Sequence, residues 1–470
     1  MSLDTLNALR AGRLAGATQV RLNGCGLTAL PEELRALAPT LEVLDVGHNP
    51  LGTLPPWLAE LPRLQVLFAS YTPLTVVPEV LGACTALRQI GLRNCQLHTL
   101  PAAALPPRLR WLTLTANALS SVPAALGDCA ELEKLMLSGN RLAQLPASLA
   151  GLSRLALLRV AANGLIQWPG WVGELPALAW LAVAGNPWCD AAPPATAAPA
   201  TAATAHRDIP WTELTLGAVL GQGAGGTTWQ ARWTPPGGPG GSGCGAAAGQ
   251  DVAVKVFGGA ITSDGTPATE LAASLCPGPH PQLTSALGAV SGHPEGASAL
   301  VMPLLPARLR PLAGPPSLAS CSRDVYDPAL RLCPADAHAV AAQAAAALAH
   351  LHAHGVLHGD VYAHNLLWAP ADPLAGLPAQ AVLSDLGAAL RWPHRLAPAW
   401  PAVQRLEVLA LGHLLDELAL RLDGHGPGLQ AQAAALRRHW APWQAACREP
   451  VPARRPAVAE VAAALARPPA

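Results

Sequence analysis

Lysine is nearly absent from the sequence, since only Lys134 and Lys255 among its 470 residues are lysine. Net charge is lacking as well, because 30 basic side chains balance 30 acidic ones. A chain without a strong field of one sign is poorly suited to nucleic acid or to an anionic membrane surface. No run of about 20 apolar residues is present that could cross a bilayer, and the start of the chain lacks the apolar centre of a signal peptide. We therefore expect an intracellular, cytoplasmic protein that binds neither nucleic acid nor membranes.

Paired cysteines are also lacking. The ten cysteines are scattered singly and form no CxxC pair, a distribution that indicates neither a disulfide framework nor a zinc site. We interpret them as reduced thiols. What the chain does have is length, because 470 residues are enough for two or three domains with large cores.

The first part of the chain repeats a short pattern, LxxLxLxxN/CxL. Its Asn or Cys slot recurs at intervals of 22 to 24 residues, at Cys25, Asn49, Thr72, Cys95, Asn117, Asn140, Asn163 and Asn186. A second marker, an apolar residue followed by proline, keeps the same phase from Leu30-Pro31 to Trp168-Pro169. Two markers in register over eight units indicate a repeat architecture. The stretch resembles the short intracellular class of leucine-rich repeats, which implies an α/β leucine-rich repeat solenoid of about eight repeats over residues 1–189.

In such a repeat each unit contributes a short strand whose leucines point inward, and the Asn side chain bonds backbone groups at the bend that follows. Eight strands give an inner surface of about 35 Å, which suits a protein partner better than a small molecule. The strand positions that we expect to be exposed, and from which a partner could be bound, are Asp45, Phe68, Tyr71, Arg93, Trp111, Met136, Arg159 and Trp180. The alternative is that only a few of them touch anything.

After Cys189 the repeat pattern stops. Residues 190–208, DAAPPATAAPATAATAHRD, are mostly alanine, proline and threonine and contain little that could pack in a core. Prolines in such a stretch favour extended conformations. We predict a linker here that tethers residues 1–189 to a second domain, residues 209–470.

Two features of the second domain indicate phosphate binding. A glycine-rich turn with Gly221, Gly223 and Gly226 lies between two strand-like segments, where backbone N–H groups can approach phosphates without Cβ atoms in the way. This signal is weak in a chain with 43 glycines. The next strand-like segment, VAVKVF at 252–257, carries Lys255 in a chain that otherwise uses arginine. Because phosphate pairing on a buried strand needs a compact ammonium group, we interpret Lys255 as a phosphate contact rather than as a solvated surface lysine.

From about Leu214 to Leu465 the chain resembles the eukaryotic-type protein kinase family, whose motifs occur here in the family's order. Glu270 resembles the helix-C glutamate that pairs with the lysine. The segment HGVLHGDVYAHNLL at 354–367 resembles the catalytic loop, and SDLG at 384–387 resembles the DFG motif. The resemblance implies an α+β bilobal protein-kinase-like fold that binds ATP and Mg²⁺.

The same resemblance implies roles for single residues. Asp360 corresponds to the catalytic base, and Lys255 and Glu270 complete the catalytic set. Asn365 and Asp385 correspond to Mg²⁺ ligands, and their oxygen atoms are of the type that this metal prefers. Besides the lysine, the positions that the resemblance assigns to nucleotide binding are Gly221, Gly223, Gly226, Ala253, Met302 and Leu367.

The departures from the family concern the activation segment. Residues 385–401, DLGAALRWPHRLAPAWP, contain no Ser, Thr or Tyr, so this segment offers no hydroxyl for activating phosphorylation. Gly359 stands where many kinases have the arginine that would bind such a phosphate. The segment also lacks the usual APE glutamate, which leaves Arg454 or Arg455 without its usual partner.

Two further departures lie near the catalytic loop. Tyr362 replaces the family's lysine two residues after the catalytic Asp, which removes a contact to the γ-phosphate. Glu407 replaces an Asp of helix F, and we expect its extra methylene to disturb the contact with the backbone of the catalytic loop.

Three functions remain compatible with the sequence. The favoured one is a weakly active or atypical protein kinase whose repeats bind a partner or substrate, with the choice between Ser/Thr and Tyr left open. The second is a pseudokinase scaffold that binds nucleotide without efficient phosphotransfer. The third is a small-molecule phosphotransferase, because the HGD motif and a short activation segment also occur in such enzymes.

Overall fold

The computed structural model describes the backbone of residues 2–189, 207–223, 225–235, 249–259, 261–426 and 428–468. It divides into two compact units, Met1–Asp190 and Ala191–Ala470, which are described in turn. The predicted linker lies outside the described residues, except for Arg207 and Asp208.

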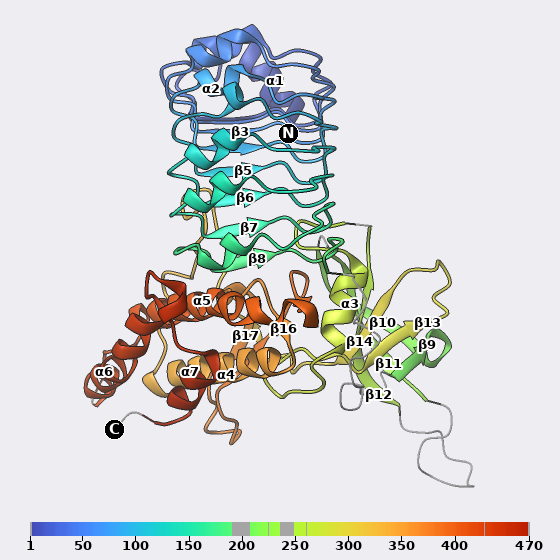
Figure 1. Ribbon diagram of the computed structural model, residues 1–470, viewed down its shortest axis with the longest axis vertical. Coiled ribbons are helices and arrows are strands. Elements are labelled where there is room, and N and C mark those ends of the chain that lie inside the picture. The colour runs from blue at the N-terminus through green and yellow to red at the C-terminus, as the bar shows by residue number, and fades with distance from the viewer. Residues whose placement is uncertain are drawn as a thin grey trace. The chain divides into compact units, whose positions relative to one another are not determined.

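The first unit is a solenoid with one parallel sheet of eight strands in chain order (Figure 1). Each strand has three residues, the middle one of which is buried, and in β4 and β8 all three are buried. The strands are β1 (Gln19–Arg21), β2 (Val43–Asp45), β3 (Val66–Phe68), β4 (Gln89–Gly91), β5 (Trp111–Thr113), β6 (Lys134–Met136), β7 (Leu157–Arg159) and β8 (Trp180–Ala182). This confirms the predicted α/β repeat solenoid.

Short helices form the outer side of the repeats. The proline of the second marker stands directly before most of them, as Pro101 does before η3, in an extended conformation that its ring favours. The helices are α1 (Ser2–Arg10), η1 (Glu32–Leu37), η2 (Pro56–Glu60), α2 (Val80–Ala83), η3 (Ala102–Ala104), η4 (Ala124–Asp128), η5 (Ala147–Gly151) and η6 (Gly170–Glu174).

The asparagines of the repeat slot form a ladder of hydrogen bonds inside the solenoid. The amide nitrogen of Asn140 donates to the carbonyl oxygens of Leu137 at 2.8 Å and of Leu114, in the preceding repeat, at 2.9 Å. Its amide oxygen accepts from the backbone N–H of Leu119 at 3.0 Å. The same pattern recurs at Asn49, Asn117, Asn163 and Asn186.

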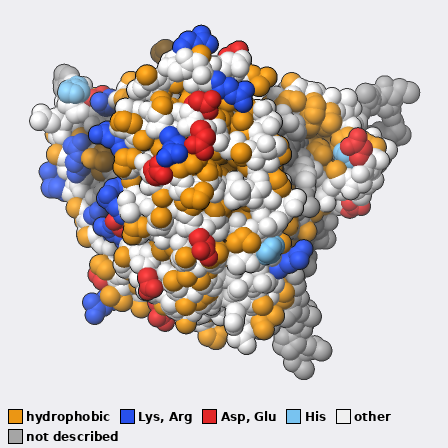
Figure 2. Space-filling model, turned by 90° about the horizontal axis from the view of Figure 1, so that it is seen from above, with side chains coloured by type: hydrophobic (Ala, Val, Ile, Leu, Met, Phe, Trp, Pro, Cys, Tyr) orange, Lys and Arg blue, Asp and Glu red, His pale blue; other side chains and the backbone are white. Residues whose placement is uncertain are grey.

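The expected binding surface is only partly exposed. Tyr71 is 41% exposed and its ring stacks on His48 at 4.3 Å between ring centroids. Arg93, Trp111 and others are half-buried, whereas Trp180 is buried, contrary to expectation. On the face shown in Figure 2 charged side chains are sparse among apolar and uncharged ones, in keeping with a chain in which 13% of residues are charged.

The second unit begins with a six-stranded sheet in the order β10-β11-β12-β14-β13-β9. Its core consists of apolar residues from all parts of the sheet, among them Ile209, Val252 and Val301. The elements are β9 (Arg207–Pro210), η7 (Trp211–Glu213), β10 (Leu214–Gly223), β11 (Gly226–Trp233), β12 (Gln250–Phe257), α3 (Pro267–Leu275), β13 (Gly288–Ser291) and β14 (Ala299–Pro303).

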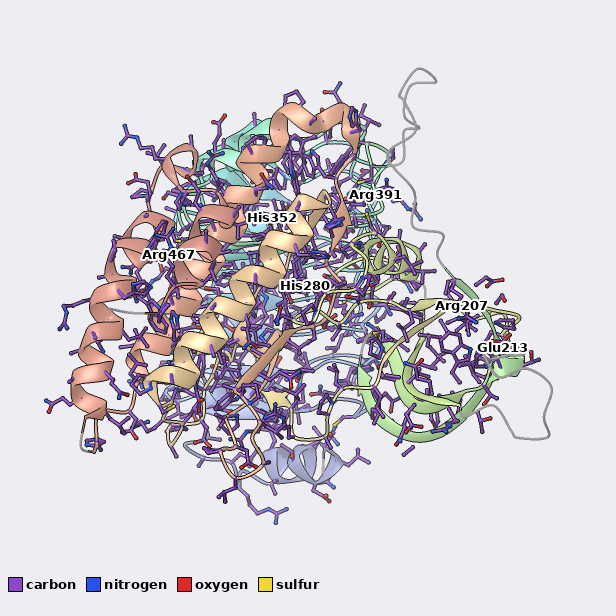
Figure 3. All side chains as sticks on the ribbon, turned by 90° about the horizontal axis from the view of Figure 1, so that it is seen from below. Arg207, Glu213, His280, His352, Arg391 and Arg467 are labelled. Atoms are coloured by element: carbon purple, nitrogen blue, oxygen red, sulfur yellow. The ribbon has the colours of Figure 1, made fainter. Side chains whose placement is uncertain are left out.

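Strand β9 corrects the predicted end of the linker. Residues 207 and 208 were expected to be linker, but they pair with β13 in parallel, with Arg207 opposite Gly288. The reason is the apolar residue that follows, because Ile209 is fully buried in the core of the sheet. Figure 3 labels Arg207 and Glu213 on this part of the unit.

The rest of the second unit is mainly helical. Helix α4 packs against α5, α6 and α7 and against the small sheet β15-β17-β18. The elements are β15 (Arg310–Pro311), α4 (Pro334–Ala353), β16 (Val356–Leu357), η8 (Ala363–Asn365), β17 (Leu366–Ala369), β18 (Gln380–Leu383), β19 (Leu390–Arg391), η9 (His394–Ala399), α5 (Trp400–Leu420), α6 (Leu429–Cys447), η10 (Pro452–Arg454) and α7 (Val458–Leu465). A sheet with one helix followed by a helical part is the predicted bilobal α+β fold.

Within the described residues, no helix is both long and apolar enough to cross a membrane. The nine cysteines in this part of the chain are free thiols.

The asparagine ladder leads to a testable prediction. Replacing Asn140 with alanine leaves two buried carbonyls and one N–H without this partner, so we expect the free energy of unfolding to fall by about 3 kcal/mol. Urea unfolding of the full chain, followed by tryptophan fluorescence, measures this. Gln144→Ala, at an exposed position of the same repeat, is the control and should change the value by less than about 0.5 kcal/mol. Equal effects of both substitutions would contradict a structural role for the ladder.

Candidate active site

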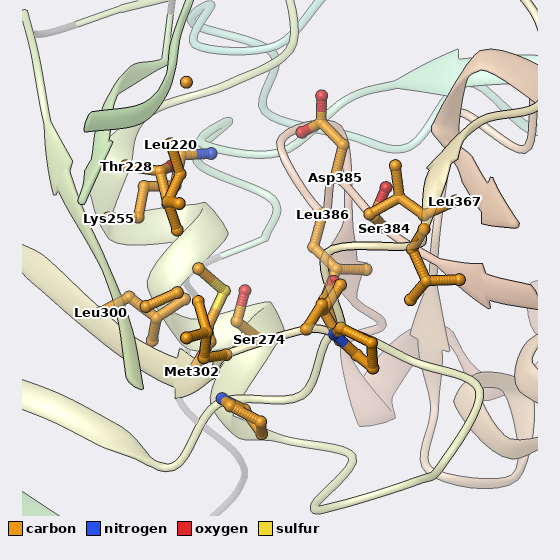
Figure 4. Close-up of a pocket in the computed structure, with 18 of the residues that line it drawn as sticks. Leu220, Thr228, Lys255, Ser274, Leu300, Met302, Leu367, Ser384, Asp385 and Leu386 are labelled. Atoms are coloured by element: carbon orange, nitrogen blue, oxygen red, sulfur yellow. The ribbon is translucent and has the colours of Figure 1, made fainter. Parts of the chain in front are cut away.

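Most of the predicted site residues meet in one cleft of the second unit. The cleft has a volume of about 600 Å³ and lies between strands of the six-stranded sheet and the segment around β17 and β18 (Figure 4). The predicted residues that line it are Gly221, Ala253, Lys255, Glu270, Met302, Leu367 and Asp385. Gly223 and Gly226 line an adjoining space of about 220 Å³ together with Lys255 and Asp385. Asp360 and Asn365 line neither space and lie on the loop before β17.

One end of the cleft is apolar. Ala253 from β12, Met302 from β14 and Leu367 from β17 line it, and these are three of the predicted nucleotide positions. The cleft is also lined by further apolar residues, among them Leu220, Leu300, Leu304, Leu305, Pro306 and Leu309. An apolar lining with few polar groups is typical of small-molecule sites.

The other end contains the lysine. Lys255 on β12 forms a hydrogen-bonded ion pair with Glu270 on α3. Helix α3 is held in place at its start by a capping box, in which Thr266 accepts from the N–H of Thr269. Burial raises the pKa of Glu270, Lys255 opposes this rise, and the charge of Asp385 adds to it. In Figure 4 Asp385 faces Lys255 from the opposite side of the cleft.

The three glycines of the turn between β10 and β11 differ in their surroundings. Gly226 has a φ of +135°, and a Cβ atom on it would lie 2.1 Å from the carbonyl oxygen of Val256. This position therefore requires glycine because β11 and β12 approach each other closely. A Cβ atom on Gly221 or Gly223 would meet nothing within 4 Å, so these two leave open space above the cleft.

Asp360 and Asn365 are held together on the catalytic loop. The side-chain amide of Asn365 donates to the carboxylate of Asp360 at 3.0 Å and to its backbone carbonyl at 2.8 Å. The carbonyl of Asn365 in turn accepts two hydrogen bonds from Ser384, one from its backbone N–H and one from its hydroxyl, each at 2.8 Å. Asp385, the next residue, has a φ of 63°. Hydrogen bonds thus link Asp360 and Asn365 to Ser384, the residue before Asp385.

His358 links the same segments. Its Nδ1 accepts from the N–H of Asp360 at 3.2 Å, so its Nε2 carries the proton and donates to the carbonyl of Ser384 at 3.1 Å. Among the described residues no three His, Cys, Asp or Glu side chains are grouped to hold a metal ion. Asn365 and Asp385 together present one amide and one carboxylate group.

Glu407 on α5 corrects an expectation from the sequence. Its carboxylate accepts from the N–H of Gly359 at 2.6 Å and from the N–H of His358 at 3.3 Å. It also accepts from the ring of His352 at 2.6 Å, which lies on α4 (Figure 3). The extra methylene therefore does not disturb the contact with the catalytic loop, because the longer side chain reaches both the loop and the histidine ring.

Arg455 has backbone partners in place of the glutamate that is usual in the kinase family. It is 1% exposed and donates to the carbonyl oxygens of Glu449 at 2.9 Å and of Arg405 at 3.1 Å. Burial lowers its pKa to about 10.

Nothing in the sequence pattern marks Asp324, which contacts the catalytic loop. It lies between β15 and α4 and accepts from the ring of His364 at 2.7 Å. Burial lowers the pKa of His364, but hydrogen bonding to Asp324 and the charges of Asp324, Asp360 and Asp385 outweigh it, so the pKa is raised.

Comparisons with known proteins match family models to parts of each unit. Two family models described as leucine-rich repeat match residues 107–165 and residues 40–61. The model described as protein tyrosine and serine/threonine kinase matches residues 214–389. Vasorin of Mus musculus is 36% identical over 123 residues, which is 25% of this chain, and the chain spans only 18% of the length of that protein.

The kinase match begins at the first strand of the glycine-rich hairpin and ends after the DLG motif. It therefore includes every site residue that the sequence predicted, from Gly221 to Asp385. The protein is a leucine-rich repeat solenoid followed by a protein-kinase-like domain.

Proposed function

We propose that this protein is an ATP- and Mg²⁺-dependent protein kinase whose leucine-rich repeats bind a protein partner or substrate. The observation that supports this most is the presence, at or beside one cleft, of Lys255, Glu270, Asp360, Asn365 and Asp385.

The cleft suits a nucleotide. Its volume of about 600 Å³ is in the usual range for small-molecule sites. The apolar residues Ala253, Met302 and Leu367 fit a base, and the glycine-rich hairpin and Lys255 fit phosphates. In this arrangement Glu270 keeps the ammonium group of the lysine directed at the phosphate end.

Asn365 and Asp385 are the residues that would hold Mg²⁺. They offer hard oxygen atoms and leave several positions for water and phosphate oxygens, as this ion prefers. When bound, ATP would supply the phosphoryl group and Mg²⁺ would neutralise the negative charge of the phosphates. Asp360, oriented by Asn365, positions the attacking hydroxyl and accepts its proton.

The activation segment is ordered by packing, which fits a kinase that is not switched on by phosphorylation there. Trp392 is buried, and its backbone N–H donates to the carbonyl of Gly355 at 2.7 Å. Its ring nitrogen donates to the carbonyl of Leu396 at 2.9 Å. No hydroxyl side chain occurs between Asp385 and Pro401. The segment is therefore held by these hydrogen bonds and offers no site for phosphorylation.

The repeats are proposed to bind a protein partner or substrate. Their inner surface carries the aromatic pair His48 and Tyr71, and the ammonium group of Lys134 lies 4.2 Å from the ring centroid of Trp111. Aromatic side chains of this kind often anchor protein interfaces.

The first prediction on activity concerns Asp360. With Mg-ATP and a general protein substrate, Asp360→Ala should lower phosphotransfer by about 100-fold or more, since it removes the base, while nucleotide binding remains. Lys255→Met should weaken both phosphotransfer and nucleotide binding. Radiolabel transfer and nucleotide-dependent thermal shift measure the two effects. Asp372→Ala, at an exposed position, is the control.

Two outcomes of this experiment would contradict the proposal. A thermal shift with Mg-ATP but no turnover under any condition would identify a pseudokinase scaffold. Turnover on small hydroxylated compounds but on no protein would identify a small-molecule phosphotransferase.

A second prediction concerns Glu407. Shortening it to aspartate withdraws the carboxylate by about 1.5 Å, so the N–H groups of His358 and Gly359 and the ring of His352 lose their acceptor. We expect kcat to fall about tenfold and the free energy of unfolding to fall by about 2 kcal/mol. Steady-state kinetics and chemical denaturation test this, with Glu295→Asp at an exposed position as the control. A variant as active and stable as the control would show that the contact is dispensable.

A further inference from the structure

The segment between β15 and α4, residues 312–333, has no part in the function proposed above. It contains no helix, and Gly314 near its start pairs with Val325 in an antiparallel bridge, in which the two residues exchange backbone hydrogen bonds of 2.8 and 3.0 Å. The bridge places the residues just before Val325 against the catalytic loop.

Asp324 is the residue of this segment that contacts the loop most closely. Its side chain is 1% exposed. One carboxylate oxygen accepts from the backbone N–H of Ala363 at 2.6 Å and from that of His364 at 3.2 Å, and the other accepts from the ring of His364 at 2.7 Å. Next to it, the hydroxyl of Tyr362 donates to the carbonyl of Ser322 at 3.2 Å.

The segment is fixed on its other side by helix α5. Glu417 accepts from Arg323 at 2.6 Å and from the hydroxyl of Tyr326 at 2.8 Å. The guanidinium group of Arg421 lies 3.4 Å from the ring centroid of Tyr326. Asp324 is therefore flanked by two residues that α5 holds in place, and its carboxylate has little freedom to follow a moving loop.

Two buried carboxylates thus bracket the catalytic loop. Glu407 accepts from the N–H groups of residues 358 and 359 and from a histidine ring. Asp324 accepts from the N–H groups of residues 363 and 364 and from a second histidine ring. Asp360 lies directly after the first pair of amides, and Asn365 lies directly after the second.

We propose that Asp324 is a positioning residue for phosphotransfer: it holds the backbone before Asn365, and through Asn365 it fixes the carboxylate of Asp360. This inference rests on the proposed kinase function. Because Asp324 lines neither the cleft nor the phosphate end, its loss affects the chemical step and leaves ATP binding unchanged.

The test compares Asp324→Ala and Asp324→Asn with the control Asp327→Ala in the full chain. Asp327 is exposed, belongs to the same segment, and its carboxylate accepts from the N–H of Ala329. Asparagine keeps the size of the side chain and one acceptor oxygen, so this variant remains informative where the alanine variant fails to fold. Two quantities are measured, which are hydrogen exchange of the peptide that contains residues 361–366 and the separate values of kcat and KM for ATP.

We expect local amide exchange and kcat to change in the Asp324 variants but not in Asp327→Ala. For Asp324→Ala, amide exchange in the 361–366 peptide should become about tenfold faster and kcat should fall about tenfold, because hydrogen bonds to a buried charged group are lost. For Asp324→Asn both changes should be smaller. The KM for ATP should stay within about twofold, and Asp327→Ala should resemble the wild type.

Three outcomes would overturn the inference. Unchanged local exchange would show that Asp324 does not hold the loop. Faster local exchange with unchanged kcat would show that holding the loop does not matter for transfer. A joint change in KM, kcat and exchange across the whole second unit would show a role in folding alone. If the wild type transfers no phosphate, the kinase proposal fails, and the exchange measurement still decides whether Asp324 holds the loop.

Discussion

Irregular backbone in this protein is held by side chains whose oxygen atoms accept from buried N–H groups. A buried N–H without a partner is costly, and neither unit satisfies such groups by helix or sheet alone. In the repeats that have asparagine in the slot, such as that of Asn140, the side-chain amide bonds backbone groups at the bend after the strand. In the second unit Glu407 does the same for the backbone before Asp360. The backbone on both sides of Asp360 is held by such contacts.

The sequence predicted those parts of the fold whose physical cause is local or periodic. A repeat of 22 to 24 residues forces equivalent strands to stack, so the eight-stranded sheet could be read from the leucine and asparagine slots. Lys255 could be found because the chain contains only one other lysine. Its predicted partner, Glu270, was the only glutamate between residues 256 and 293, and the structure places the two in contact.

The sequence could not predict contacts that join distant segments without a motif. Asp324 is 39 residues from the N–H group that it binds, and no pattern surrounds it. The reach of Glu407 depends on the distance between α5 and the loop, which composition does not reveal. The requirement for glycine at position 226 likewise comes from the approach of a neighbouring strand. In each case the determining quantity is a distance between elements.

Strand β9 has a mechanical consequence for the chain that joins the two units. Its backbone pairs with β13 from Arg207 to Pro210, and Ile209 is fully buried below it. A force that pulls on the chain before Arg207 therefore acts first on the hydrogen bonds between β9 and β13, which it loads in shear. The glycine-rich hairpin begins later in the chain, at Leu214. The cleft that contains Lys255 is in this way separated from a force applied to the chain before Arg207.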